Sequence, residues 1–88
     1  MANKKISRQD LQVIEAVLFA SEDVLTQSKL NVCFHSDSVP ILKDAVRQLQ
    51  REYEKSDRAF SIEIVAGGFR LKTLVEYETW VRRLFTRE

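Results

Sequence analysis

The sequence predicts an α+β domain of the winged helix-turn-helix class: three helices, a β-hairpin wing and a C-terminal helix. Three observations support this fold class. Capping residues and apolar spacing predict successive helices over about residues 8–20, 26–33 and 40–55. Two alternating segments then flank the two glycines of the chain, Gly67 and Gly68. Helical spacing returns after Thr73, so we expect one domain over residues 7–88 behind a disordered leader at residues 1–6.

The first helix is predicted to run from about residue 8 to residue 20. Ser7 and Asp10 are spaced to satisfy the free backbone N–H groups at a helix start. The expected buried stripe consists of Leu11, Ile14 and Leu18. Val13, Val17 and Phe19 widen this apolar surface.

The second and third helices follow across a polar turn. Thr26 is a plausible cap for a short helix that ends near Cys33, which we expect to be a small buried residue, and Val24–Leu25 before the cap is a candidate strand. Residues 35–38 form the expected turn, and Pro40 is placed in the first turn of a helix that runs to about Lys55. Its predicted buried stripe is Leu42, Val46, Leu49 and Tyr53.

The paired glycines predict a tight hairpin turn between two strands. With Gly67 and Gly68 as the central residues of a type I′ turn, both would have positive φ. The predicted register pairs Ala66 with Phe69, Val65 with Arg70, Ile64 with Leu71, Glu63 with Lys72 and Ile62 with Thr73. In that register Ile62, Ile64, Phe69 and Leu71 share the inward face.

The C-terminal helix carries a broad apolar stripe made of Tyr77, Trp80, Val81, Leu84 and Phe85. Packing in the core is the favoured role for Trp80, whereas surplus exposure would mark an interface. If the domain self-associates, our candidate interface residues are Val13, Val17, Trp80 and Phe85.

Basic residues raise the question of nucleic acid. Lys43, Arg47, Arg51 and Lys55 recur at every fourth position of the third helix, while Arg70 and Lys72 lie on the wing. In a helix-turn-helix protein these positions could meet a DNA groove and its phosphates. The same stripe also fits a solvated face or a charged surface for a partner protein. A formal net charge of +1 makes direct nucleic-acid binding the less favoured alternative.

Composition argues against several other classes. Hydrophobic residues make up 44% and charged residues 31%, as in a folded soluble protein. No apolar run approaches the roughly 18 to 20 residues of a membrane span. Cys33 and His35 are too few for a zinc site and lack a fixed acid for catalysis, so we expect no enzyme, metal or cofactor. A single cysteine suits a reducing, cytoplasmic compartment.

Four segments resemble the amino-terminal winged-helix domain of the bacterial segregation and condensation protein B family. They are "IEAVLFASEDVLT" at 14–26, "LQREYE" at 49–54, "IEIVAGGFRLKT" at 62–73 and "EYETWVRRL" at 76–84, in family order. The segment "NVCFHSDSVP" at 31–40 departs from the family pattern.

The resemblance implies a non-enzymatic subunit of the Smc condensin complex that acts in chromosome condensation and segregation. Such a subunit forms a homodimer and binds the kleisin, segregation and condensation protein A, and through it the Smc ATPase. It would be cytoplasmic and associated with the nucleoid. The alternative expectation is a DNA-binding winged-helix transcriptional regulator.

Overall fold

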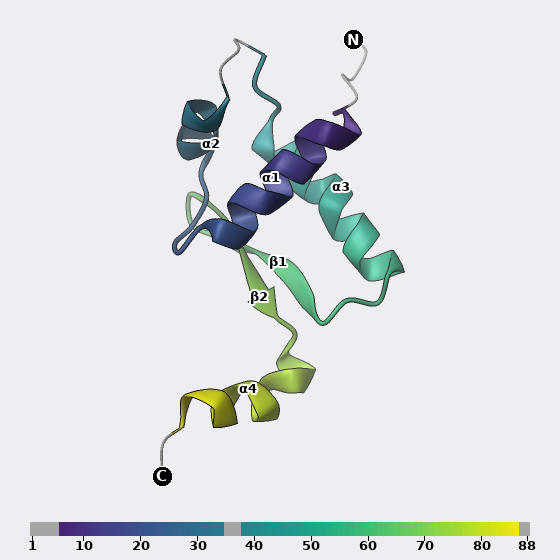
Figure 1. Ribbon diagram of the computed structural model, residues 1–88, viewed down its shortest axis with the longest axis vertical. Helices are drawn as coiled ribbons and strands as arrows, with labels where there is room; N and C mark the ends of the chain where they lie inside the picture. Colours follow the sequence, from purple (N-terminus) through teal and green to yellow (C-terminus); the bar gives the residue numbers. More distant parts are fainter. Residues whose placement is uncertain (1–5, 35–37, 87–88) are drawn as a thin grey trace.

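The computed structural model describes residues 6–34 and 38–86, and it confirms the predicted winged helix-turn-helix fold. Three helices come first: α1 (Arg8–Ala20), α2 (Gln27–Cys33) and α3 (Leu42–Lys55). An antiparallel hairpin of β1 (Phe60–Val65) and β2 (Gly68–Thr73) follows. The 3-10 turn η1 (Val75–Tyr77) then leads into α4 (Glu78–Phe85). Figure 1 shows α1 crossing α3 above the hairpin, with α4 at the far end of the molecule.

The hydrophobic core lies where the first three helices meet. Helix α1 has the predicted bounds, and the Ser7 hydroxyl accepts a 3.0 Å hydrogen bond from the Asp10 amide at its start. Ile14 and Leu30 are fully buried, and the predicted stripes of α1 and α3 are all buried. The other buried apolar residues are Leu11, Leu18, Leu25, Leu42, Ala45, Val46, Leu49 and Tyr53. Burying one large apolar side chain contributes about 1.5–3 kcal/mol, which makes this cluster the main source of stability.

Two details of the second and third helices differ from prediction. Helix α3 begins at Leu42, beyond Pro40, because the Gln27 side chain accepts the Leu42 amide hydrogen at 2.7 Å and so caps the helix from α2. Thr26 caps α2 as predicted, its hydroxyl accepting from the Lys29 amide at 3.2 Å. Cys33, which we expected to be buried, is exposed at the end of this short helix. Residues 35–37 of the polar turn predicted at residues 35–38 lie outside the described residues.

The hairpin forms, but the predicted register is wrong by two residues. The turn is Ala66–Gly67, and Val65 pairs with Gly68, Ile64 with Phe69 and Ile62 with Leu71. Gly67 has a φ of 87°, and Gly68 does not have positive φ. A positive φ at the second central residue alone is the φ pattern of a type II turn rather than a type I′ turn.

Glycine is needed at position 68 because the segment at residues 24–25 approaches its backbone closely. A Cβ atom at this position would lie 2.2 Å from the Leu25 carbonyl oxygen. Leu25 and Phe69 exchange two backbone hydrogen bonds, of 2.7 and 2.9 Å, so the predicted short strand at residues 24–25 is present as a bridge to the wing. The small glycine therefore lets the wing pair with the segment between α1 and α2.

Three of the four residues predicted on the inward face of the hairpin, Ile62, Phe69 and Leu71, pack against the core. The prediction is wrong for Ile64, whose side chain is 79% exposed. Ile64 lies one residue before the end of β1, next to the turn. It is therefore an apolar side chain left at the surface.

The C-terminal helix does not close the core. None of its residues is buried, and the predicted core position of Trp80 is wrong, since 65% of this residue is exposed. The short segment from Leu74 to Tyr77 carries α4 away from the other helices (Figure 1). This projection contributes to the elongated extents of 53 × 27 × 22 Å. At the other end, residues 1–5 of the predicted leader lie outside the described residues, whereas Ile6 packs against the core.

Candidate protein interface

Helix α4 presents an exposed apolar surface. We call Trp80, Leu84 and Phe85 the α4 face; Leu84 lies one turn beyond Trp80 on the same side of the helix, and Phe85 adjoins Leu84. Leu84 and Phe85 are each 77% exposed, and Val75 and Tyr77 before the helix are exposed as well. The Tyr77 and Trp80 rings lie 6.3 Å apart. Contiguous exposed apolar side chains of this size on a small domain are typical of an interaction surface.

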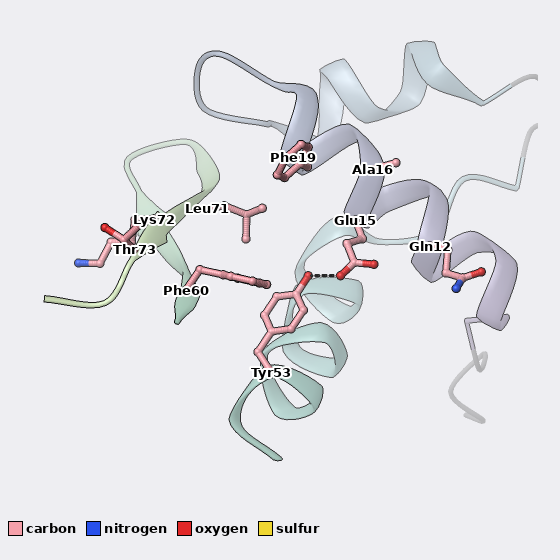
Figure 2. Close-up of a pocket in the computed structure, with 9 residues that line it drawn as sticks. All are labelled: Gln12, Glu15, Ala16, Phe19, Tyr53, Phe60, Leu71, Lys72 and Thr73. Carbon is pink, nitrogen blue, oxygen red and sulfur yellow. Dashed lines mark hydrogen bonds between the residues drawn. The ribbon is translucent and has the colours of Figure 1, made fainter. Parts of the chain in front are cut away.

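A groove of about 510 Å³ lies between α1, the end of α3 and the hairpin. Figure 2 shows Leu71 and Phe60 projecting from the hairpin towards α1, with Phe19 at one end of the groove. Phe19 is 81% exposed. The lining residues, which define the α1 groove, are Gln12, Glu15, Ala16, Phe19, Tyr53, Phe60, Leu71, Lys72 and Thr73. The groove is largely apolar, as is typical of binding sites on protein surfaces.

One hydrogen bond fixes the polar part of the α1 groove. The Tyr53 hydroxyl donates to Glu15 Oε2 at 2.8 Å, and the Tyr53 ring meets Phe60 edge to face with centroids 4.9 Å apart. Burial, followed by the hydrogen bond to Glu15, raises the pKa of Tyr53 well above its usual range. The Tyr53 hydroxyl therefore stays neutral, and its hydrogen bond holds the Glu15 carboxylate at the wall of the groove.

The structure divides the predicted interface residues into two groups. Trp80 and Phe85 are exposed on α4. Val13 and Val17 are half-buried on α1, and Val17 packs against the core. Phe19 and Leu84 are among the exposed apolar residues that the prediction did not select. Helical spacing placed both on apolar stripes, but spacing alone does not show which stripe lacks a neighbour.

The six predicted DNA-contact residues do not form one surface. Lys43, Arg47 and Arg51 line a second hollow, between α3 and the inward face of the hairpin. Arg70 and Lys72 lie on the other face of the hairpin, because side chains alternate along a strand. Lys55 lies at the end of α3, outside the lining of that hollow.

The wing cations are also partly neutralised. Arg70 Nε lies 2.9 Å from Glu63 Oε1, and Lys72 Nζ lies 4.0 Å from Glu63 Oε2. The hydrogen bond from Arg70 holds the pKa of the Glu63 carboxyl below its usual range. Both arginine and lysine are thus directed to a carboxylate of their own hairpin rather than to a common external anion.

The described residues contain neither a cluster of metal-ligating side chains nor a helix that could span a membrane. Within residues 6–34 and 38–86, no group of three or more histidine, cysteine, aspartate or glutamate side chains is arranged to hold a metal ion. His35 lies outside the described residues. Over the same described ranges no helix combines the length and the apolar character needed to cross a bilayer.

Sequence comparison identifies a family and two relatives. The model of the segregation and condensation complex subunit ScpB matches residues 12–88. A segregation and condensation protein B homolog of Coxiella burnetii is 30% identical over 79 residues, which cover 86% of this chain and 37% of that protein. Segregation and condensation protein B of Syntrophotalea carbinolica is 32% identical over 72 residues, which cover 82% of this chain and 36% of that protein. The chain thus spans little more than a third of the length of these relatives.

Two solved structures share the fold. A conserved hypothetical protein from Chlorobium tepidum superposes with a TM-score of 0.79 and 35% identity, over 90% of this chain and 49% of that one. The second structure is a dimer of the ScpB N-terminal domain complexed with an ScpA peptide. It superposes with a TM-score of 0.71 and 25% identity, over 88% of this chain and 95% of that one.

Proposed function

Because this chain belongs to the ScpB family, we propose that it is a non-enzymatic interaction module of the bacterial Smc condensin complex, acting in chromosome condensation and segregation. In this role the domain forms a homodimer and binds the kleisin subunit ScpA, which connects it to the Smc ATPase. Its place is the cytoplasm, in association with the nucleoid. The similar ScpB N-terminal domain that was solved as a dimer with an ScpA peptide supports both contacts.

The observation that carries the proposal is the exposed α4 face. In the described part of the chain, Trp80, Leu84 and Phe85 project from an element whose main contacts are with the adjoining turn. A lone globular domain gains nothing from holding a tryptophan and a phenylalanine in water, whereas both residue types dominate the centres of protein interfaces. A scaffold subunit requires such a surface.

The α4 face of one copy is proposed to lie in the α1 groove of a second copy. Both surfaces are apolar. The α1 groove includes Thr73, the last residue of β2, after which the chain continues towards α4. Reciprocal insertion would make two equivalent contacts, as expected for a twofold dimer.

Sedimentation equilibrium over a range of protein concentrations tests the homodimer. We expect a concentration-dependent dimer that is weakened by Trp80→Ala and by Phe19→Ala, since truncating a central aromatic residue typically costs about 2 kcal/mol or more per contact. Val32→Ala removes an equally exposed apolar side chain from α2 and should leave the dimer unchanged. A protein that stays monomeric at every concentration would contradict self-association by this domain. Loss of the dimer in Trp80→Ala but not in Phe19→Ala would place the α4 face against another surface.

Kleisin binding is tested by mixing the domain with ScpA and measuring the mass of the complex by light scattering. The expected result is a stable species heavier than either component. The alternative of a DNA-binding regulator finds less support, since its candidate cations lie on two faces and three of them pair with carboxylates of this chain. It predicts salt-dependent duplex binding that Arg47→Glu abolishes, whereas the scaffold role predicts no such binding.

A further inference from the structure

A second groove of about 560 Å³ runs between α3 and the inward face of the hairpin. It shares no lining residue with the α1 groove. We call it the α3 groove; its lining residues are Lys43, Val46, Arg47, Gln50, Arg51, Glu54, Ile62, Ile64 and Phe69. It is therefore available to a partner when the α1 groove is filled.

The floor of the α3 groove is apolar. Val46 is buried, Ile62 and Phe69 pack against the core, and Ile64 stands opposite Phe69 in the hairpin with 79% of its surface exposed. The Gln50 side chain accepts the Ile62 amide hydrogen at 2.9 Å, so α3 itself occupies part of the outer edge of β1. This arrangement disfavours a partner that adds a strand and favours one that inserts side chains between α3 and Ile64.

The rim of the α3 groove is basic. Lys43, Arg47 and Arg51 recur every four residues, so like charges adjoin along one edge. The Arg47 guanidinium lies 3.8 Å from Asp44 Oδ1. This ion pair is weak, because both side chains are at least half exposed. Within the described residues, neither Lys43 nor Arg51 forms an ion pair. Glu54 is the single carboxylate of the lining, and it accepts a hydrogen bond from Gln50 at 3.2 Å.

We propose that the α3 groove binds an acidic segment of the kleisin subunit whose apolar side chains contact Ile64 and Phe69 and whose carboxylates pair with Lys43 and Arg51. The inference rests on the proposed function for the identity of the partner, and it adds the site and the chemistry of the segment. A protein segment fits better than nucleic acid, because the floor is apolar and the wing cations lie on the other face of the hairpin.

Isothermal titration of ScpA into the domain tests the site with two variants and two matched controls. Ile64→Ala and Arg51→Glu are each expected to weaken binding at least about tenfold. Val32→Ala removes a comparable exposed β-branched side chain, and Lys55→Glu makes the same charge change one turn further along α3, outside the groove lining. Both controls should stay within about twofold of the unchanged domain. Circular dichroism verifies that each variant keeps its helix content.

The outcomes separate the two proposals. If the unchanged domain binds ScpA and neither Ile64→Ala nor Arg51→Glu weakens binding, the α3 groove is not the site, although the proposed function stands. If ScpA does not bind at all, the proposed function fails and this inference fails with it. Two further results overturn the inference alone. In the first, a labelled DNA duplex competes with ScpA for the domain, and the Arg51→Glu variant no longer binds the duplex. In the second, the main defect of the Ile64→Ala variant is loss of the homodimer.

Discussion

Replacing Gly68 with alanine should destabilise the domain more than the same change at the neighbouring Gly67. At Gly68 the new Cβ would lie 2.2 Å from the Leu25 carbonyl oxygen and 2.5 Å from Val24 Cγ1, so the wing must move away from this segment. The movement breaks the two hydrogen bonds between Leu25 and Phe69, which contribute about 1 kcal/mol each. Imperfect repacking adds about 1 kcal/mol or more, which gives a loss of about 3 kcal/mol.

At Gly67 the cost has a different origin and is smaller. No atom outside the neighbouring residues lies within 4 Å of the new Cβ, but a φ of 87° is unfavourable for alanine by about 1–2 kcal/mol. The reduced freedom of the unfolded chain offsets part of this, about 0.4–1 kcal/mol, so the net loss is about 1 kcal/mol.

Urea denaturation of both variants measures the two free energies of unfolding. Hydrogen exchange at the Leu25 amide supplies a local measurement: protection should fall in Gly68→Ala and persist in Gly67→Ala. Equal losses of stability, or a larger loss at Gly67, would refute the assigned turn and the contact with Leu25.

Three further changes test the core, the α1 groove and the wing. Ile14→Ala removes a fully buried side chain and should lower the free energy of unfolding by about 2–5 kcal/mol in urea denaturation; a loss below that range would mean that the core is looser than described. Tyr53→Phe removes the 2.8 Å hydrogen bond to Glu15 and should cost about 0.5–1.5 kcal/mol by the same measurement, and no loss at all would contradict a stabilising role for this bond. Arg70→Ala should raise the pKa of Glu63 towards its ordinary value in an NMR titration. Because folding lowers this pKa, the stabilisation is present above the unfolded-state pKa and is lost as pH falls through the folded-state value; an unchanged pKa would argue against the ion pair.

Local signals predicted the parts of the fold that depend on local interactions. The bounds of α1 follow from its own cap and stripe, which lie within 13 residues. The start of α3 could not be predicted in this way, because its cap comes from Gln27, 15 residues earlier in the chain. The turn register failed for a related reason. Strand side chains alternate with a period of two, so a slip of two residues leaves every side chain on its predicted face.

The candidate site shows a second limit of sequence patterns. The stripe that includes Trp80 and Phe85 has the same helical spacing as the buried stripe of α3. Periodicity shows that one face of a helix is apolar but not whether the chain's own core or another molecule covers it. The α3 cations illustrate the same limit: their spacing was evident, whereas the apolar floor beside them depends on the fold of the hairpin.

The shortness of α4 has a consequence for how its contacts form. An eight-residue helix has little stability in water, and the start of this one lacks a side-chain cap. The Glu78–Arg82 pair, at 2.8 Å, contributes only about 0.2–0.5 kcal/mol. Formation of α4 is therefore thermodynamically coupled to the surface that covers its apolar face, and part of the binding enthalpy is offset by the entropy of ordering. Because none of the α4 residues is buried, this helix can unfold and refold while the core built by the first three helices stays folded.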